Sequence, residues 1–246
     1  MQPLGSVNSL RASCKWDEWT ILRPFSYPAV KDYDRTGMAK LSSVNVGRPQ
    51  QVSVRRGRPL MSAIGKAPVA GRVRVSGVNL EGDDQADRRV HGGPDKAVYA
   101  YAAEDTAWWE DELGRALGPG AFGENLTVEG VDVSGAVVGE RWTVGSTELE
   151  VAQPRLPCAK LGLRFGDPKM LKRFAQARRP GAYLRIVREG ELGAGDAIEV
   201  AARPGHGITV RDVSVALLLD ERLLAFAAAA PELPEELSRW MLERAA

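Results

Sequence analysis

Cysteine and histidine are scarce in this chain, which has two of each in 246 residues. Cys14 and Cys158 are separated by more than half of the sequence, so they do not form the dense pattern of a disulfide framework. Neither residue type occurs at the close spacing that zinc ligands require. These features exclude a disulfide-rich secreted domain and a recognisable zinc site.

Long apolar runs and an excess of one charge are also missing. The longest apolar run, residues 223–230, is far too short to cross a bilayer. The N-terminus has no basic segment followed by an apolar one, so we expect a cytoplasmic protein with no membrane partner. With 33 basic and 32 acidic side chains the formal charge is +1, which argues against a nucleic-acid binder.

The first 37 residues differ from the rest of the chain. Trp16, Trp19 and Phe25 are scattered among Ser, Pro and charged residues with neither helical nor strand periodicity. We interpret residues 1–37 as a disordered extension upstream of the true initiator, Met38. The alternative is a native but poorly ordered N-terminal arm.

Residues 38–205 have mainly the pattern of β-strands and are predicted to form one domain. Alternation of apolar and polar residues predicts strands at 71–78, 141–145, 147–151, 182–188 and 196–200. Gly145-Ser146 predicts a hairpin turn between the second and third strands, and Glu189-Gly190 predicts a similar turn between the last two. Helical patterns occur at 103–117 and at 167–178, where Asp167-Pro168 is a start signal. Many short strands with few helices predict a mainly β fold, a β-barrel.

Residues 206–246 are predicted to form a second, small domain of three helices, at 209–219, 220–229 and 234–245. Thr209 is suited to cap the first helix and Pro234 to begin the third. The apolar positions expected to face one another are Val213, Leu217, Leu223, Phe226, Leu237 and Met241. So small a unit buries little surface alone, so we expect it to dock on the barrel or on a second subunit.

The segment Gln153-Pro-Arg-Leu-Pro-Cys-Ala-Lys-Leu-Gly carries the most chemical information. Two prolines stiffen the chain before Cys158, which fixes the direction of its sulfur at a small entropic cost. Arg155 and Lys160 supply nearby positive charge, which favours the thiolate, the form that binds metals and attacks electrophiles. The alternative is a buried, inert cysteine.

A second loop of interest is His91-Gly-Gly-Pro-Asp-Lys-Ala. Its adjacent glycines allow a ligand to approach the backbone closely. Arg88 and Arg89 precede His91 and Lys96 follows it, so the loop is suited to a phosphate or an anionic cofactor. Asp95 offsets part of this charge, and an ordinary Gly-Gly-Pro turn with a packed His91 explains the same residues.

Two further loops are less specific. Gly120-Ala-Phe-Gly-Glu-Asn-Leu-Thr has the spacing of neither a dinucleotide fingerprint nor a P-loop, and read alone it is a capped turn into a strand. Residues 81–87 are acidic and suited to a hard cation. A solvated loop, or one that pairs with Arg88 and Arg89, explains them equally well.

Five segments, in this order, resemble the MOSC family, which is named after the C-terminal domain of molybdenum cofactor sulfurases, and within it the YiiM-like branch. They are NLEGDDQAD (79–87), VHGGPDKAV (90–98), GAFGENLT (120–127), QPRLPCAKL (153–161) and GAYLRIV (181–187). The resemblance covers residues 41–203, and the tail from 209 resembles the three-helix domain that follows MOSC in that branch. The chain has no room for the aminotransferase-like domain of full-length sulfurases.

The resemblance implies a MOSC-type β-barrel that binds the molybdenum cofactor, molybdopterin, with the sulfur of Cys158 on the metal. Members similar to this chain are oxidoreductases that reduce N-hydroxylated compounds, such as hydroxylamino-purines and amidoximes. The residues implied to bind the cofactor are Lys66, Arg88, Arg89, His91, Lys96 and Arg155. Those implied to act with Cys158 in catalysis are Glu124, Asn125 and Lys160.

The sequence has no cysteine cluster for an iron–sulfur centre, so the electrons would come from a separate reductase. Two other functions fit the same residues. One is a sulfur carrier that holds a persulfide on Cys158, and the other is a non-catalytic module that binds molybdopterin. A homodimer is compatible with each of these functions.

The N-terminal interpretation is tested by a chain that starts at Met38. Because residues 1–37 lack periodicity and the family resemblance begins after them, this chain should fold and melt like the full-length protein. Thermal unfolding followed by circular dichroism measures the difference. A melting temperature lower by many degrees would show that residues 1–37 pack on the rest of the protein.

Overall fold

The computed structural model describes residues 38–55, 58–86 and 92–246. Cys14, Arg88, Arg89 and His91, and the predicted extension 1–37, lie outside the described residues.

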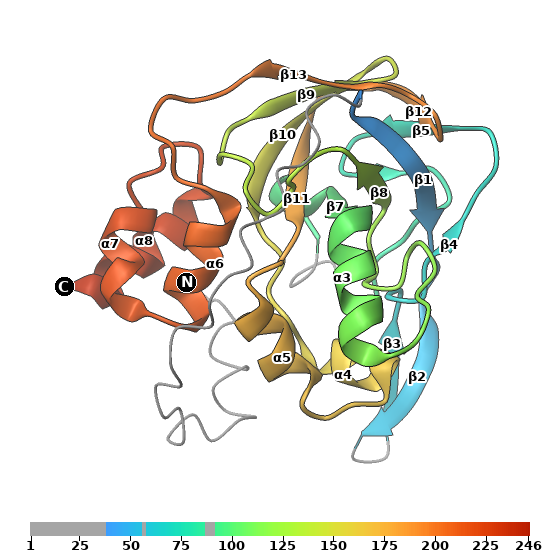
Figure 1. The fold of residues 1–246 in the computed structure, drawn as a ribbon, viewed down its shortest axis with the longest axis horizontal. Helices are drawn as coiled ribbons and strands as arrows, with labels where there is room; N and C mark the ends of the chain where they lie inside the picture. Colours follow the sequence, from blue (N-terminus) through green and yellow to red (C-terminus); the bar gives the residue numbers. More distant parts are fainter. Residues whose placement is uncertain (1–37, 56–57, 87–91) are drawn as a thin grey trace.

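A mixed sheet of eight strands forms the centre of the fold (Figure 1), and its spatial order differs from the order in the chain. All neighbouring strands are antiparallel except β7 and β8, which are parallel. From one edge to the other, the strands are β13 (Ile198–Ala202), β9 (Arg141–Val144), β10 (Thr147–Pro154), β11 (Ala182–Arg188), β7 (Val98–Ala102), β8 (Leu126–Glu129), β1 (Lys40–Val46) and β4 (Ala67–Pro68).

Two smaller sheets complete the β-structure of the described residues. One joins β12 (Gly190–Gly193), β5 (Arg72–Ser76) and β6 (Asn79–Leu80), and the other is the hairpin of β2 (Gln50–Arg55) and β3 (Arg58–Ser62). The fold is therefore mainly β, as predicted.

The predicted β9–β10 hairpin is confirmed, with Gly145 at a φ of +58° in the turn. The second predicted hairpin is wrong. Residues after Glu189 form β12, which pairs with β5, while β13 pairs with β9. Leu192 of β12 is fully buried, and the burial of this side chain explains why the segment joins another sheet instead of serving as a turn.

The edge strand β13 of the large sheet approaches β1, the strand next to the opposite edge strand β4. Lys40 and Ala197 form an isolated antiparallel bridge. Next to it, the Leu41 amide donates to the Asp196 carbonyl at 2.8 Å, and the Ile198 amide donates to the Ala39 carbonyl at 2.8 Å. These contacts curl the sheet. The strand pairing is nevertheless that of an open sheet with β13 and β4 at its edges. The closed barrel therefore stays a prediction.

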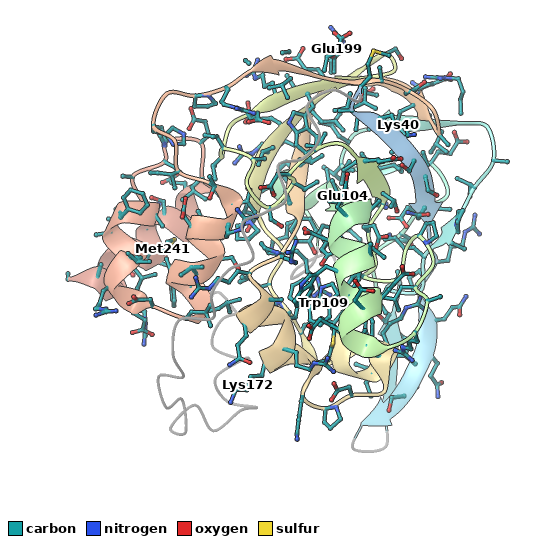
Figure 2. The ribbon with its side chains drawn as sticks, viewed as in Figure 1. Lys40, Glu104, Trp109, Lys172, Glu199 and Met241 are labelled. Carbon is teal, nitrogen blue, oxygen red and sulfur yellow. The ribbon has the colours of Figure 1, made fainter. Side chains whose placement is uncertain are left out.

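Strand β7 separates two hydrophobic cores, because successive side chains of a strand point to opposite faces. Val98, Ala100 and Ala102 belong to the larger, aliphatic core. Tyr99 and Tyr101 belong to an aromatic core that also contains Trp109, Phe122, Phe165 and Phe174. Figure 2 labels Trp109 on the helix that covers this second core.

Three helices and one short turn lie close to the aromatic core. They are η2 (Pro94–Lys96), α3 (Ala103–Leu113), α4 (Ala159–Phe165) and α5 (Met170–Ala177). The helix predicted at 167–178 begins later than expected, since Asp167 accepts hydrogen bonds from the Lys169 and Met170 amides and caps a turn. The analysis of the sequence did not predict α4, which is only seven residues long.

The three predicted C-terminal helices are present as α6 (Val210–Leu218), α7 (Leu224–Ala227), which follows the turn η3 (Glu221–Leu223), and α8 (Glu235–Ala245). Val213, Leu217, Leu237 and Met241 are buried, as expected. Leu223, the last residue of η3, and Phe226 in α7 are exposed, contrary to the expectation. Both elements are single short turns, which present few residues to the core.

Backbone hydrogen bonds join α6 to the rest of the protein. The Val210 and Arg211 amides donate to the Ala136 and Ser134 carbonyls at 2.9 and 2.8 Å. Residues of α6 and α8 belong to the same apolar cluster as the sheet, while a domain boundary at residue 205 stays a prediction. In the part of the chain that the structure describes, no helix combines the length and apolarity that crossing a bilayer requires.

The start of α6 provides a test of the fold. The Thr209 hydroxyl accepts from the Asp212 amide, and the Asp212 carboxylate accepts from the Thr209 amide, which completes a capping box. Thr209→Ala should lower the free energy of unfolding by about 1 kcal/mol, or roughly 2–4 °C in melting temperature. Thr209→Ser keeps the hydroxyl and should melt like the wild type. Equal melting temperatures for the Ala and Ser variants would contradict this role.

Candidate functional site

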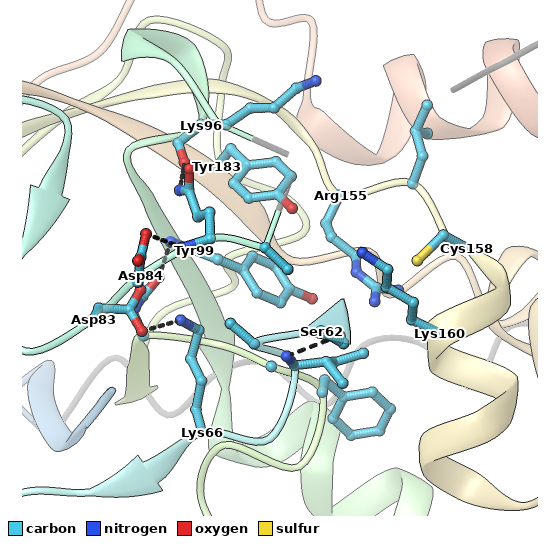
Figure 3. Close-up of a pocket in the computed structure, with 18 residues that line it drawn as sticks. Ser62, Lys66, Asp83, Asp84, Lys96, Tyr99, Arg155, Cys158, Lys160 and Tyr183 are labelled. Carbon is cyan, nitrogen blue, oxygen red and sulfur yellow. Dashed lines mark hydrogen bonds and ion pairs between the residues drawn. The ribbon is translucent and has the colours of Figure 1, made fainter. Parts of the chain in front are cut away.

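An open pocket lies where β3, β7, β11 and α4 meet the loops around residues 83–86 and 120–125 (Figure 3). Its empty space, counted out to the open solvent, is about 660 Å³. It is lined by Ser62, Ala63, Ile64, Lys66, Asp83, Asp84, Gln85, Ala86, Lys96, Tyr99, Phe122, Gly123, Asn125, Arg155, Leu156, Cys158, Lys160 and Tyr183.

Cys158 lies between the end of β10 and the start of α4. Its backbone is extended, with φ of −132° and ψ of 166°, and its carbonyl accepts a hydrogen bond from the Leu161 amide. The thiol is free and partly exposed on the pocket wall. The rigid approach that the two prolines predict therefore ends with a sulfur that a ligand can reach.

Arg155 is buried beside this cysteine, with an exposed fraction of 5%. Its guanidinium carbon lies 5.1 Å from the ring centre of Phe174 and 6.0 Å from that of Tyr99. The Nη1 atom is buried without a hydrogen-bond partner among the described residues. A buried cation in such a setting is costly unless a ligand or a counter-ion stabilises it.

Lys66 and Asp83 form a buried ion pair at the other end of the pocket. The Asp83 carboxylate also accepts hydrogen bonds from the Gly47 amide at 2.7 Å and from Asn125 Nδ2 at 2.9 Å. Burial lowers the pKa of Lys66 below its ordinary value of 10.5, although Asp83 acts in the opposite direction. This carboxylate thus fixes both a lysine and an amide in the pocket wall.

Glu124 organises the loop that carries Asn125. Its carboxylate is fully buried and accepts hydrogen bonds from the Gly120 amide at 2.6 Å, the Phe122 amide at 3.0 Å and the Thr127 hydroxyl at 3.1 Å. Burial raises the pKa of Glu124, and these hydrogen bonds oppose that effect. Glu124 lies behind the pocket wall and does not line the pocket.

Glycines allow this loop to pack against the segment that carries Lys66. At Gly120, with a φ of +81°, a Cβ atom would lie 2.7 Å from the Lys66 carbonyl oxygen. At Gly123, with a φ of +80°, a Cβ atom would lie 2.8 Å from Cγ1 of Ile64. The glycines of the 120–127 motif therefore allow this close packing.

Two tyrosines form an aromatic wall between the two ends of the pocket. Tyr99 of β7 and Tyr183 of β11 are cross-strand partners, and their ring centres are 5.3 Å apart. The Tyr99 hydroxyl donates to the Pro180 carbonyl at 2.9 Å. Burial raises the pKa of Tyr99 well above its usual range, so this side chain stays neutral.

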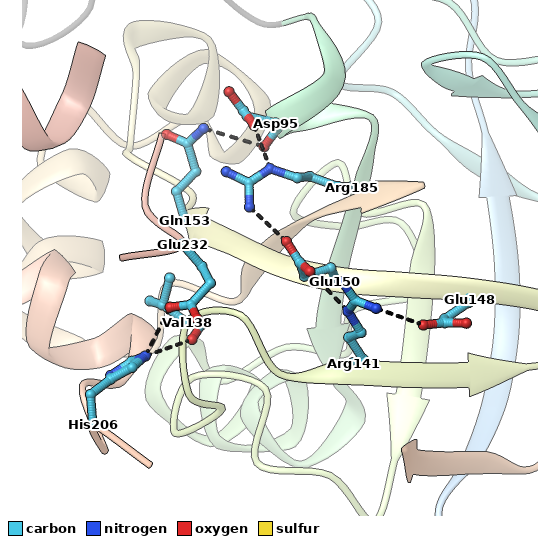
Figure 4. Close-up of polar contacts among 9 residues, drawn as sticks. All are labelled: Asp95, Val138, Arg141, Glu148, Glu150, Gln153, Arg185, His206 and Glu232. Carbon is cyan, nitrogen blue, oxygen red and sulfur yellow. Dashed lines mark hydrogen bonds and ion pairs between the residues drawn. The ribbon is translucent and has the colours of Figure 1, made fainter. Parts of the chain in front are cut away.

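Lys96 reaches the pocket from the turn η2, which several polar contacts hold in place (Figure 4). Arg185 joins Asp95 of this turn to Glu150 on β10. Gln153 Nε2 donates to the Asp95 carbonyl at 3.2 Å. Burial lowers the pKa of Lys96, while Asp95 and then Glu236 raise it.

The structure brings together six of the residues that the sequence singled out, namely Lys66, Lys96, Asn125, Arg155, Cys158 and Lys160. The cofactor-binding and catalytic roles of these six residues stay predictions. Asp83, Tyr99 and Tyr183 were not predicted. The acidic run 81–87 was the available signal for Asp83, but we expected a bound cation, a solvated loop or pairing with Arg88 and Arg89. Among the described residues Asp83 pairs with Lys66, and a pairing of this run with Arg88 or Arg89 lies outside the described residues.

The pocket combines a reachable thiol, cationic side chains, aromatic walls and an amide. These groups suit a flat, polar, anionic ligand that an accessible sulfur can contact. Within residues 38–246, apart from the undescribed segments, no group of three or more His, Cys, Asp or Glu side chains could hold a metal ion.

Comparison with known proteins gives a family match. The model of the MOSC domain matches residues 87–199, which include η2, the 120–127 loop and Cys158.

Three curated relatives each match about two thirds of the chain. The uncharacterized protein YflK of Bacillus subtilis is 39% identical over 169 residues, or 69% of this chain and 76% of YflK. The protein YiiM of Escherichia coli is 33% identical over 64% of this chain and 70% of its own length. A protein named "Reductase" from Gibberella moniliformis is 33% identical over 67% of this chain, but the match spans only 29% of that longer protein.

A solved structure shares the fold. The crystal structure of YiiM from Geobacillus stearothermophilus superposes with a TM-score of 0.69 and 27% identity, over 85% of this chain and 100% of that chain.

Gly120 provides a test of how the pocket is built. Gly120→Ala places a Cβ atom against the Lys66 carbonyl at a positive φ, so it should cost at least about 1–2 kcal/mol from backbone strain alone. Gly118→Ala is the matched control, because a Cβ atom there meets nothing within 4 Å. Thermal unfolding compares the two variants. If both melted at the same temperature, the packing of this loop would not constrain the Lys66 segment.

Proposed function

This chain belongs to the MOSC domain family, as a YiiM-like member, and we propose on this basis that its pocket binds the molybdenum cofactor. We further propose that the protein is an oxidoreductase that reduces N-hydroxylated compounds. The observation that carries the proposal is the free thiol of Cys158 in a pocket with a buried Arg155, whose Nη1 atom has no hydrogen-bond partner among the described residues. MOSC domains are associated with this cofactor, and a relative is named a reductase.

The residues of the pocket fit the cofactor chemically. Molybdopterin brings two sulfur ligands to its metal, so a single protein thiolate at Cys158 is sufficient. This requirement agrees with a pocket in which one cysteine is accessible and no larger group of metal ligands is described. The anionic and polar edges of the cofactor require cations and hydrogen-bonding groups, which Arg155, Lys96 and Asn125 provide.

When bound, the cofactor would supply a two-electron redox centre for cleavage of the N–O bond. Reduction of an N-hydroxyl group to an amine consumes two electrons and two protons and releases one water. Tyr99 and Tyr183 would stack against a planar substrate or cofactor ring, and Lys160 would orient the substrate near Cys158. Glu124 would act as a positioning residue for Asn125 and not as a group that touches substrate.

The electrons would come from a separate reductase. Two cysteines in the whole chain are too few for an iron–sulfur cluster of the four-cysteine type. The fungal relative named "Reductase" is much longer than this chain, and only 29% of it is matched. This difference in length agrees with our proposal that a separate partner protein supplies the electrons to this chain.

Two other functions remain open for the same site. A sulfur carrier would use the Cys158 thiol to hold a persulfide, and a non-catalytic module would bind molybdopterin without turnover. The buried Arg155 agrees with each of these functions, because the cofactor and a persulfide are both anionic. A closed barrel, a homodimer and a cytoplasmic location belong to the same proposal.

Cys158→Ala tests the metal ligand. The side chain is small and partly exposed, so the variant should lose no more than about 1 kcal/mol of stability. Protein produced in a molybdenum-replete host should contain much less molybdenum than the wild type, and reduction of an N-hydroxylated purine with an added reductase should fall to background. Leu163→Ala, at an exposed position of the same helix, is the control and should retain both.

The outcomes separate the three functions. Full activity in Cys158→Ala would refute a thiolate ligand. Wild-type protein with molybdenum and pterin but no turnover would favour the binding module. Wild-type protein without molybdenum, but with one extra sulfur atom on Cys158 by mass spectrometry, would favour the carrier.

A further inference from the structure

The segment that leaves the pocket and forms α4 and α5 is strongly basic. Residues 155–179 contain eight basic side chains and one acidic side chain, Asp167, whereas the whole chain has a net charge of only +1. Asp167 is already paired with Arg173 of the same segment. The rest of the chain therefore carries a net negative charge, and positive charge is concentrated in the two helices beside the pocket (Figure 1).

Arginines elsewhere on the surface usually have a carboxylate partner. Seven exposed examples pair with Asp or Glu side chains, namely Arg72, Arg141, Arg188, Arg203, Arg222, Arg239 and Arg244. The cations around α4 differ from these. Arg115, Arg164 and Lys169 are exposed, and no ion pair joins them to a described residue. Their charge is therefore available to a partner from solution.

This cationic surface, made of Arg115, Arg164 and Lys169, adjoins the rim of the pocket. Lys160, which lines the pocket, and Arg164 are four residues apart on α4 and so lie on the same side of the helix. Arg164 Nε donates to the carbonyl of Ala121, in the glycine loop of the pocket wall, at 3.3 Å. The Arg115 guanidinium donates to the carbonyl of Phe165, the last residue of α4, at 3.3 Å.

The cationic surface is also close to the thiol that is proposed to bind the metal. Cys158 directly precedes α4, and seven residues at a rise of ~1.5 Å each give this helix a length of only about 10 Å. Electrons pass efficiently between two proteins only when their redox centres are near each other, so an electron donor has to dock beside the pocket. Redox complexes have small, transient interfaces, and electrostatic attraction lets such complexes form quickly.

We propose that Arg115, Arg164 and Lys169 form the docking surface for the electron donor, and that this donor is a redox protein with an acidic face. The inference rests on the proposed function, which requires a separate donor. Exposed cations attract an acidic partner from a distance and orient it as it arrives. The orientation that they impose here would place the donor against α4, next to the opening of the pocket.

Binding of a bacterial flavodoxin, a small acidic flavoprotein that carries electrons, tests the cationic surface in the full-length protein. Isothermal titration calorimetry at low ionic strength should detect a complex, and added salt should weaken it. Lys169→Glu should weaken binding about tenfold, because it replaces an attraction by a like-charge repulsion. The variant should keep its fold, since a carboxylate at the start of α5 suits the helix dipole.

Two control variants separate this surface from general effects. Arg74→Glu reverses an exposed arginine that also lacks an ion pair with a described residue, on β5 and far from α4 in Figure 1. Leu163→Ala changes an exposed side chain of α4 but none of its charges. Both should bind flavodoxin like the wild type. If Lys169→Glu does not fold, Arg115→Glu takes its place.

Two results of the binding experiment would overturn the proposal. One is the absence of a complex at low ionic strength, or equal affinity in Lys169→Glu and Arg74→Glu. The other is tighter binding of a duplex DNA than of flavodoxin at physiological ionic strength, with loss of the DNA complex in Lys169→Glu. That result would assign the surface to nucleic acid, which the net charge of +1 does not favour.

Turnover by cofactor-loaded protein distinguishes this inference from the proposed function. With reduced flavodoxin as the donor, Lys169→Glu should reduce an N-hydroxylated purine about tenfold more slowly than the wild type at low ionic strength. With dithionite, a small reductant that needs no docking surface, the two proteins should be equally active. No turnover by the wild type with dithionite contradicts the proposed function alone and leaves the binding measurement to decide the surface. Equal rates for the two proteins with flavodoxin contradict this inference alone.

Discussion

The carboxylate of Asp83 holds together four segments that are distant in the sequence. It pairs with Lys66, which precedes β4, and accepts from the Gly47 amide, which follows β1, and from Asn125, which precedes β8. The loop that carries Asp83 is thereby joined to the other three segments. With these partners the charge of Asp83 is compensated inside the protein, whereas an unpaired carboxylate at this depth would be costly. One wall of the pocket depends on this set of contacts.

The sequence predicts those features that depend on residues close together in the chain. The β9–β10 hairpin follows from alternation around Gly145-Ser146, and the start of α6 follows from Thr209, since both signals are complete within a few residues. The rigid approach to Cys158 is local in the same way. Helix α4 escaped prediction because seven residues show too little periodicity to distinguish a helix from a loop.

Features that depend on distant partners were not accessible. The pairing of Asp83 with Lys66 is invisible in the sequence, because an acidic run looks the same whether it faces water, a cation or a buried lysine. Tyr99 and Tyr183 read as ordinary strand residues, and only the register of β7 with β11 places both on the pocket. Glu124 is a further case. Its motif predicted a catalytic residue, whereas its carboxylate accepts hydrogen bonds from the Gly120 and Phe122 amides of its own loop.

The contact between β1 and β13 has a consequence for synthesis on the ribosome. Lys40, among the first residues of the described fold, forms a bridge with Ala197, near the end of the sheet. Until that late segment leaves the exit tunnel, the backbone groups of β1 around Leu41 lack their partners at residues 195 and 196. An unpaired strand edge of this kind promotes association with other chains. We therefore expect the nascent chain to depend on chaperones until its last strand is made. We also expect products truncated before this strand to be prone to aggregation.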